Sequence, residues 1–298
     1  MTIQPWPNPT PLQRGDLVHV AATSSALDGD QTMLDGLTVL ESWGLHVLRP
    51  ELSSRQWGYL AGTDQERRGD LVSAAGKAQL LACARGGWGA ARLLEEHMPW
   101  QPGWMLGFSD ITALLWSRLA AGYSGGVHGP LLTTLAKEPN WSQERLRQLL
   151  FGETVPALHG GGLGGGRVQG PLIAANLTVA SHLIGSQHVP DLTGAILILE
   201  DVGEAPYRID RLLTHWRLSG LLQKVGGIGF GSFSGCDDDE RPRDQCFTLQ
   251  QVLRERTDDL NIPRVIDLPV GHLCGNAALP MGALAELDGD KGWLNLLI

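Results

Sequence analysis

The chain has 298 residues, of which 43% are hydrophobic, and this is enough for a sizeable core in one large domain or two lobes. Its 23 Lys and Arg residues against 32 Asp and Glu residues give a net charge of −9. This balance disfavours nucleic-acid backbones and anionic membrane surfaces as main partners, and a small or neutral ligand fits it better.

The sequence carries no clear signal for export or for metal binding by cysteine. Segment 1–16 lacks a basic stretch followed by an apolar one, and no apolar run is long enough to span a bilayer. The four cysteines show no C-x-x-C spacing, which argues against a zinc ribbon or a dithiol redox site. We therefore expect a cytoplasmic protein in a reducing compartment, with no membrane partner, no metal and no cofactor.

Strands and helices alternate through the first half of the chain. Short apolar runs predict strands, periodic segments predict helices, and glycines mark helix ends. In chain order we predict a strand over 17–22, a helix around 34–40, a strand over 46–48, a helix from 63 to about 75, a strand over 79–84, a helix near 90–97, a strand ending at 107 and a helix over 110–121. This alternation is typical of a parallel sheet covered by helices, with ligands at the carboxyl ends of its strands.

Periodicity is lost between residues 136 and 168, where the chain passes through KEPNWS and then GGGLGGG at 160–166. The composition is typical of a flexible connector, and the glycine run lacks the Lys-Ser/Thr of a phosphate-binding loop. We therefore predict an N-terminal α/β lobe over 1–135, a linker over 136–168 and a C-terminal lobe over 169–298.

The second half mixes strands and helices. We predict a helix near 174–184, a buried strand over 194–200, a helix from Pro206 to just before Gly220, a strand over 225–233, a helix near 244–256, a strand within 263–269 and two strands around the turn at 288–292. The predicted fold class is therefore α/β with two lobes.

Ser109 is the first candidate for chemistry. It follows the predicted strand that ends at Gly107 and directly precedes a predicted helix, which is the geometry of a nucleophile elbow. The free N–H groups at the start of that helix would also stabilise an oxyanion. The alternative is that Ser109 or Asp110 simply caps the helix, since the sequence G-x-S-D is not the full G-x-S-x-G motif.

A serine nucleophile needs a base, and usually an acid that orients the base. His272 follows a predicted strand in a glycine-flanked loop, where its side chain can be presented at the strand end. Glu200 ends an otherwise apolar strand, so burial would require a partner for its carboxylate. The alternatives are a loop histidine bonded to backbone and a strand that emerges into solvent at Glu200. Glu204 and Asp210 are competing acids.

Two further segments are candidates for binding. RGGWG at 85–89 follows a strand, so the backbone N–H groups of Gly86 or Gly87 could contribute to an oxyanion hole together with that of Asp110; the alternative is a tight turn that needs glycine. The acidic run at 237–240 has no His or Cys at ligand spacing, so we interpret it as a solvated loop.

Several blocks together resemble the LD-carboxypeptidase family of serine peptidases, in the family's order and over essentially the whole chain. They are ARGGWGAARLL at 84–94, GFSD at 107–110, HGP at 128–130, ILEDVGEAPYRIDRLL at 198–213 and PVGHLCGNAALPMGA at 269–283. The resemblance implies an N-terminal lobe similar to class I glutamine amidotransferases, a C-terminal lobe of strands and helices, and a homodimer. One departure is GPLIAANL at 170–177, where the family pattern has a pair of glycines before the asparagine.

By the family's motifs, the nucleophile falls on Ser109, the acid on Glu200 and the base on His272. The resemblance implies cleavage between the L-centre of a diamino acid and the terminal D-alanine of murein tetrapeptides, a step of cell-wall recycling, with a small murein peptide as the partner. An immunity branch of the family hydrolyses peptidyl-nucleotide antibiotics, but we find no evident aromatic platform for a nucleobase apart from Trp141. A non-catalytic peptide-binding module is the third alternative.

Overall fold

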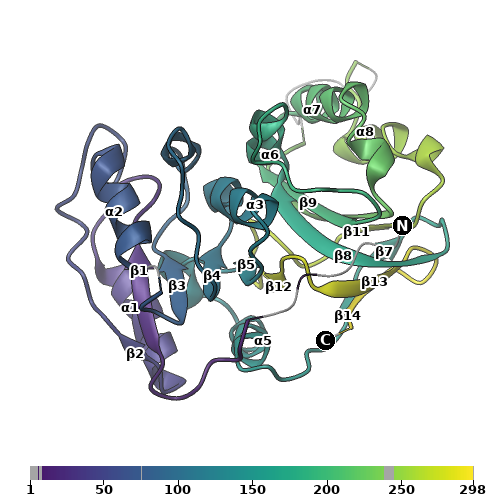
Figure 1. Cartoon of the computed structure of the whole chain (residues 1–298). Coiled ribbons are helices and arrows are strands. Elements are labelled where there is room, and N and C mark those ends of the chain that lie inside the picture. Colours follow the sequence, from purple (N-terminus) through teal and green to yellow (C-terminus); the bar gives the residue numbers. More distant parts are fainter. Residues whose placement is uncertain (1–5, 7–8, 75, 238–244, 298) are drawn as a thin grey trace.

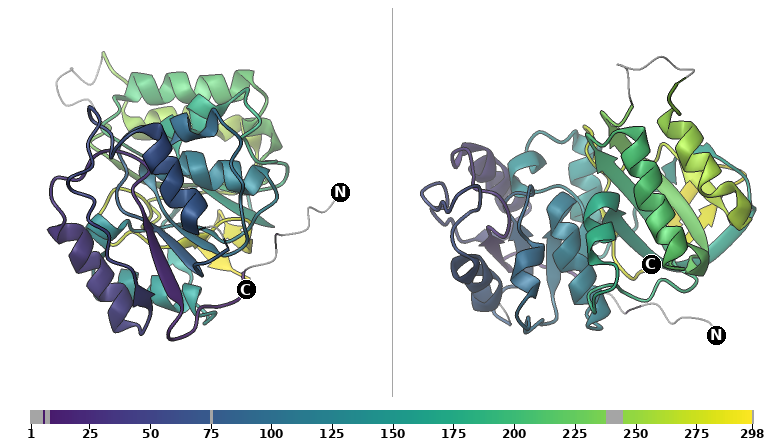
Figure 2. Two further views of the ribbon diagram at one scale, coloured as in Figure 1. Left: turned by 60° about the vertical axis from the view of Figure 1, so that its left-hand side comes forward. Right: turned by 90° about the horizontal axis from the view of Figure 1, so that it is seen from above.

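The computed structural model describes residues 6, 9–74, 76–237 and 245–297 and has two sheets, each with helices packed against it. Figures 1 and 2 show the two halves side by side, with the first sheet in the N-terminal half and the larger second sheet in the C-terminal half. The predicted α/β fold with two lobes is confirmed. Within the described residues, no helix is both long enough and apolar enough to cross a membrane.

The first sheet has the strand order β12-β5-β4-β3-β1-β2. Its strands are β1 (Leu17–Ala21), β2 (His46–Val47), β3 (Leu80–Cys83), β4 (Trp104–Gly107), β5 (Gly126–His128) and β12 (Leu279–Pro280). The first five are parallel, as the alternating pattern predicts, whereas β12 runs antiparallel to β5. The sheet of the N-terminal half therefore has, at one edge, a strand from the C-terminal half.

The second sheet has the strand order β6-β14-β13-β8-β9-β10-β11-β7. Its strands are β6 (Leu158–His159), β7 (Gly161–Gly162), β8 (Arg167–Asn176), β9 (Ile196–Val202), β10 (Gly227–Ser234), β11 (Arg264–Ile266), β13 (Leu284–Asp288) and β14 (Trp293–Leu296). The central strands β8 to β11 are parallel, and their inward side chains are almost entirely apolar and buried. Parallel strands that are covered on both faces have this composition.

The helices connect the strands of each sheet and cover its faces (Figure 1). In the N-terminal half they are α1 (Gln31–Ser42), α2 (Asp64–Ala74), α3 (Thr112–Ala120), α4 (Leu132–Leu135) and α5 (Asn140–Leu150); in the C-terminal half they are α6 (Leu177–Leu183), α7 (Pro206–Leu218) and α8 (Leu249–Glu255). Short 3-10 turns are η1 (Ala91–Leu94), η2 (Ser109–Ile111), η3 (Leu222–Lys224) and η4 (Asp258–Leu260).

Several local predictions are corrected by the structure. The segment near 90–97 forms only the short turn η1 rather than a helix, and the carbonyls of Leu93 and His97 accept hydrogen bonds from the Arg68 side chain at 2.6 and 2.8 Å instead of from backbone N–H groups one turn later. Residues 174–176 belong to strand β8, so the helix predicted over 174–184 begins at Leu177. The helix predicted over 244–256 is α8, which starts at Leu249 after the cap Thr248.

The segment 136–168 is not an irregular connector. It contains α5, whose buried face includes Leu146, Leu149 and Leu150. It also contains β6, which pairs with β14, and β7, which pairs with β11. The glycine run is hydrogen-bonded into the second sheet: Leu163 N–H donates to the Arg264 carbonyl, 2.9 Å away. The lobe boundaries themselves stay a prediction. Residues 238–240 of the predicted acidic loop lie outside the described residues.

Candidate active site

Ser109 sits at a sharp turn between the end of β4 and the start of η2. Its φ of 62° is in the left-handed region, which a residue with a side chain adopts only at a cost of about 1–3 kcal/mol. The preceding residue, Phe108, is extended, and α3 follows directly after η2. This is the strained strand-turn-helix geometry that projects a nucleophile above a sheet.

The glycine-rich loop after β3 lies against this turn. A methyl group added at Gly86 would lie 3.0 Å from Cβ and 3.1 Å from Oγ of Ser109. Gly87 has a φ of 112°, and a methyl group there would collide with Ser25 Oγ at 2.2 Å. Within the described residues, no acceptor is paired with the backbone N–H of Gly86 or Gly87. The structure therefore brings Gly86 directly to Ser109, and Gly87 lies next to Gly86 in the same loop.

Asp110 connects three segments around the elbow. Its buried carboxylate accepts hydrogen bonds from Ser24 Oγ at 2.6 Å and from Ala90 N–H at 2.9 Å. Burial raises the pKa of Asp110, and these two hydrogen bonds oppose the rise. The side chain thus holds the loops after β1 and β3 beneath the nucleophile, while its backbone N–H lies in the first turn of η2.

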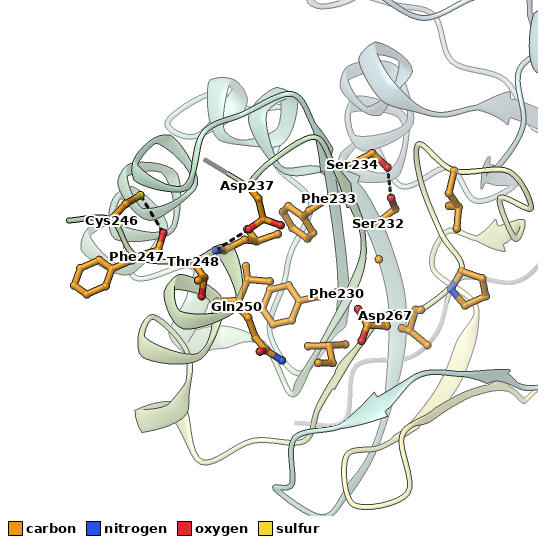
Figure 3. A pocket seen from close by; sticks show the side chains of 17 residues that line it. Phe230, Ser232, Phe233, Ser234, Asp237, Cys246, Phe247, Thr248, Gln250 and Asp267 are labelled. Carbon is orange, nitrogen blue, oxygen red and sulfur yellow. Dashed lines mark hydrogen bonds between the residues drawn. The ribbon is translucent and has the colours of Figure 1, made fainter. Parts of the chain in front are cut away.

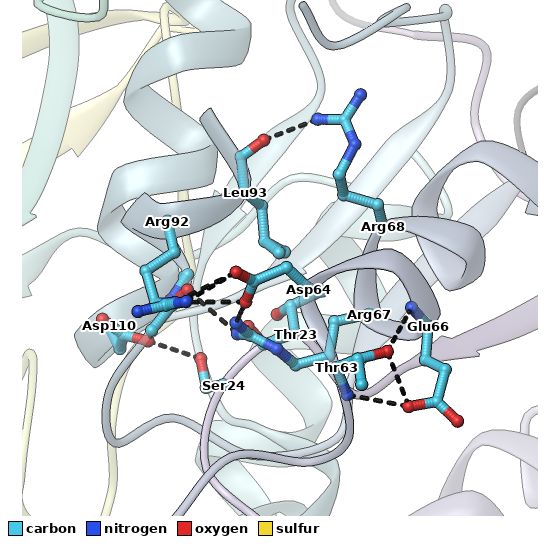
Figure 4. A network of polar contacts seen from close by, with 12 residues as sticks. Thr23, Ser24, Thr63, Asp64, Glu66, Arg67, Arg68, Arg92, Leu93 and Asp110 are labelled. Atoms are coloured by element: carbon cyan, nitrogen blue, oxygen red, sulfur yellow. Dashed lines mark hydrogen bonds and ion pairs between the residues drawn. The ribbon is translucent and has the colours of Figure 1, made fainter. Parts of the chain in front are cut away.

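A fully buried guanidinium braces the same loops (Figure 4). Arg67 of α2 donates to the carbonyls of Thr23 at 2.6 Å and Gly89 at 2.9 Å, and it forms an ion pair with Asp64. Because the two carbonyls belong to the loops after β1 and β3, Arg67 fixes the spacing between them. This residue was not singled out from sequence, where it is one of two adjacent arginines on a polar helix.

Glu200 is fully buried in β9, so the alternative in which the strand emerges into solvent at this residue is wrong. Its Oε2 accepts a hydrogen bond from Nδ1 of His272 at 2.6 Å. Burial raises the pKa of Glu200, and the hydrogen bond and charge of His272 oppose this rise. A methyl group added at Gly231 would lie 3.3 Å from Cβ of Glu200, and one added at Gly271 would lie 2.5 Å from Oε2.

His272 points from its loop toward the elbow and the acid. Its ring lies 4.8 Å from the ring of Phe108, the neighbour of Ser109, measured between centroids. Burial lowers the pKa of His272, but the hydrogen bond and charge of Glu200 outweigh that effect and raise it above its ordinary value. Within the described residues, no hydrogen bond joins Ser109 Oγ to His272. Hydrogen bonds of this kind are often formed only when substrate is bound.

The loop of His272 is held by several buried contacts. Asn276 Oδ1 accepts from Gly271 N–H at 2.8 Å, and the carbonyl of His272 accepts from Ser234 Oγ at 2.5 Å. Glu138, from the segment between α4 and α5, accepts from the N–H groups of Gly275 at 2.8 Å and Asn276 at 3.0 Å. His272 is therefore placed by residues of both halves of the chain.

The competing acids lie elsewhere. Glu204 pairs with Arg208 at 3.3 Å, and Asp210 pairs with Arg256 at 3.5 Å. Neither makes a hydrogen bond or ion pair with His272 in the part of the chain that the structure describes. Of the three candidate acids, only Glu200 is brought to the base.

Sequence reasoning missed Glu138 and Asn276, which hold the base, and His128, which ends β5 beside the acid. His128 belongs to HGP at 128–130, one of the blocks that resemble the family, so the sequence did mark this residue. Glu138 lies in the segment interpreted as a linker, where no local pattern marks a buried carboxylate. Among the described residues, no group of three or more His, Cys, Asp or Glu side chains could hold a metal ion.

A cavity of about 680 Å³ lies beside the His272 loop, between β10, α8 and the segment after β11 (Figure 3). Phe230 and Leu253 contribute apolar walls, and Asp237 and Asp267 are its charged side chains. Leu273 lines it, as does Ser234, whose hydroxyl holds the His272 carbonyl. The cavity thus adjoins the back of the His272 loop rather than the elbow.

The strained turn at Ser109 and the Glu200–His272 pair form a candidate serine hydrolase site on a two-lobed α/β fold, and the comparisons identify the family. The chain matches the family models of the LD-carboxypeptidase N-terminal domain over residues 18–129 and C-terminal domain over residues 169–287. The chain belongs to this family, and it is a serine-type carboxypeptidase, a hydrolase.

Two relatives match along almost their whole length. A Synechocystis protein provisionally named a carboxypeptidase is 47% identical, with 97% of each chain covered. The murein tetrapeptide carboxypeptidase of Pseudomonas aeruginosa is 34% identical, with 92% of this chain and 94% of the relative covered. The names of the relatives place the family in murein processing.

Solved structures show the same two-domain fold. The muramoyltetrapeptide carboxypeptidase of Oxalobacter formigenes matches with a TM-score of 0.81 and 25% identity, covering 94% of this chain and 97% of that one. The microcin C7 self-immunity protein MccF, bound to glutamyl sulfamoyl guanosine, matches with a TM-score of 0.82 and 21% identity, covering 97% and 98%. The second likeness concerns the fold alone.

Proposed function

We propose that the protein removes the terminal D-alanine from murein tetrapeptides during cell-wall recycling, with Ser109 as nucleophile, His272 as base and Glu200 as orienting acid. The observation that carries the proposal is the 2.6 Å hydrogen bond between the fully buried Glu200 and His272, whose ring packs on Phe108 beside the strained Ser109. An acid, a base and a nucleophile from distant parts of the sequence converge there.

The chemistry follows from these positions. Nε2 of His272 takes the proton of Ser109 Oγ, which attacks the carbonyl of the diamino acid and forms a tetrahedral oxyanion. The backbone N–H of Asp110 and that of Gly86 or Gly87 stabilise this charge. The imidazolium then protonates the leaving amine, D-alanine departs, and water releases the acyl group with His272 again as base. Glu200 keeps the proton on Nδ1 and stabilises the imidazolium.

The experiment measures free D-alanine released from a purified murein tetrapeptide. We expect release by the natural protein and none above background by Ser109→Ala. Ser54 is exposed and makes no hydrogen bond to the elbow among the described residues, so Ser54→Ala is the matched control and should keep full activity. Full activity of Ser109→Ala would refute the serine mechanism.

Hydrolysis of a peptidyl nucleotide is a second candidate, because two exposed aromatic rings adjoin the glycine loop. The rings of Tyr59 and Trp88 lie 6.3 Å apart in an edge-on arrangement. Exposed Trp141 packs by the His272 loop, and a methyl group at Gly275 would lie 2.5 Å from its ring. The expectation that Trp141 alone offers a stacking surface is therefore incomplete.

A competition assay separates these candidates. Murein tetrapeptide and aspartyl sulfamoyl adenosine are offered together, and the products of each are quantified. We expect the higher kcat/KM for the tetrapeptide, in line with the names of the relatives. Preferential hydrolysis of the nucleotide conjugate would favour the immunity function, and binding of the tetrapeptide without release of D-alanine would favour a non-catalytic binding module.

The proposal includes a cytoplasmic location and a homodimer. The resemblance to the family implies the homodimer, and the location is part of the proposed role in cell-wall recycling. Light scattering on the purified protein measures the mass against the 32.1 kDa of one chain. A mass of one chain at micromolar concentration would overturn the dimer.

A further inference from the structure

His128 is a buried histidine with no assigned role. It is the last residue of β5, fully buried, and its register partners are Gly107 of the nucleophile strand and Leu279 of β12. In the part of the chain that the structure describes, neither Nδ1 nor Nε2 of His128 has a hydrogen-bond partner. A buried polar group without a partner costs about 1–3 kcal/mol, so its retention calls for a reason.

An oxygen of Glu200 supplies that reason. Nε2 of His128 lies 3.9 Å from Oε1 of Glu200, and Oε1 is also without a hydrogen-bond partner among the described residues. The other oxygen of Glu200 binds His272. The carboxylate therefore faces two imidazoles, one from each lobe, and Phe108 packs against both rings at 4.8 and 5.8 Å between centroids.

Electrostatics restrict what His128 can contribute. Burial, and then the charge of His272, lower the pKa of His128 to about 3, so the ring is neutral and has one N–H to donate. The charge of Asp201 also disfavours the ionised form of Glu200, whereas the side chain of Asn176 favours it. A neutral donor stabilises a buried carboxylate without competing for the proton of His272.

We propose that His128 is a positioning residue for the acid: its Nε2–H donates to Oε1 of Glu200 in the working enzyme, which holds the carboxylate in line with His272 and shares its charge. The inference rests on the proposed triad. An approach of roughly 1 Å brings the two atoms to hydrogen-bond distance. In this arrangement a residue of β5, from the lobe that carries Ser109, directly orients Glu200.

The test uses the pH dependence of kcat/KM for D-alanine release. Removal of the donor leaves more charge on Glu200 and makes His272 harder to deprotonate. We therefore expect His128→Leu to lower kcat by about 10-fold to 100-fold with little change in KM. The acid limb, which is the part of the pH profile where kcat/KM falls as the pH drops, should move to higher pH by roughly half a unit or more. His128→Asn, which keeps an N–H donor, should restore much of kcat and leave the acid limb near its natural position.

The exposed His159→Leu is the matched control and should change neither quantity. A purely structural role would lower kcat or stability in His128→Leu and leave the acid limb in place, and that result would overturn the proposal, as would unchanged activity. If His128→Leu does not fold, ¹⁵N NMR of the natural protein decides, because the proposal requires the proton of neutral His128 on Nε2. A proton on Nδ1 would refute it.

A second readout separates this inference from the proposed substrate. A fluorophosphonate probe labels a serine that is activated by a base, and its rate is followed against pH without any peptide. Labelling that is lost in Ser109→Ala and shifted to higher pH in His128→Leu supports the inference even if the tetrapeptide is not cleaved. Labelling whose pH dependence is the same in His128→Leu and in the natural protein contradicts it.

Discussion

Replacing Gly86 by alanine tests whether the glycine loop and the elbow are in contact as described. The added methyl group would lie 3.0 Å from Cβ and 3.1 Å from Oγ of Ser109, where ordinary van der Waals contacts are 3.4–4 Å. The φ of Gly86 is outside the left-handed region, so the backbone itself accepts alanine. The clash must therefore be relieved by moving either the loop or the nucleophile by several tenths of an ångström.

The expected loss of activity follows from that displacement. A misplacement of about 1 Å costs roughly 100-fold in rate, so we expect Gly86→Ala to lower kcat for D-alanine release by about 10-fold to 100-fold. The cost in folding free energy should be small, on the order of 1 kcal/mol, because the clash is confined to one contact. Steady-state kinetics and thermal unfolding, measured on the same preparation, separate the two quantities.

Gly69 provides the matched control. It lies in the exposed part of α2, and a methyl group there would meet no atom within 4 Å. Gly69→Ala should leave kcat unchanged and stabilise the helix by roughly 0.5–1 kcal/mol. A natural value of kcat in Gly86→Ala would refute the packing of the loop against Ser109, and with it the assignment of this loop to the oxyanion hole.

Three more predictions concern the base and its supports. Since Glu200 raises the pKa of His272, kcat/KM should fall as the pH drops through a value above the ordinary 6.5, measured from pH 4 to 9 in steps of about 0.5; an acid limb below 6.5 would contradict this. Glu138→Ala leaves two buried N–H groups unpaired and should cost roughly 2–4 kcal/mol in urea unfolding, whereas Glu138→Gln should recover part of it. Arg67→Met should cost roughly 2–4 kcal/mol, and an unchanged urea midpoint would argue against its bracing role.

The fold was predictable wherever one local pattern decided an element. The apolar run at 194–200 is strand β9, and Pro206 and Gly220 bound helix α7. Ser109 was identifiable because a strand, a turn and a helix meet there in sequence. A strained backbone at Ser109 is typical of that motif, but its φ of 62° is known only from the structure.

The contacts between lobes could not be predicted, because no local signal encodes them. Helix α5 has leucines at helical spacing, but the neighbouring proline and glycine residues made the whole segment resemble a connector. Glu138 and Asn276 are more than 130 positions apart in sequence. Only the folded chain shows that the carboxylate of Glu138 binds the loop that contains Asn276. The same holds for the approach of His128 to Glu200.

The pairing of β12 with β5 limits how the protein can be divided. Leu279 and Pro280 close the edge of the first sheet next to His128, so a fragment that stops before them would leave β5 as an open edge able to pair with another chain. Neither half can therefore be expected to behave as an independent module. A split version of this enzyme would recover activity only if the second fragment supplied this short strand along with the base, so reassembly of the sheet and reassembly of the catalytic site would be one event.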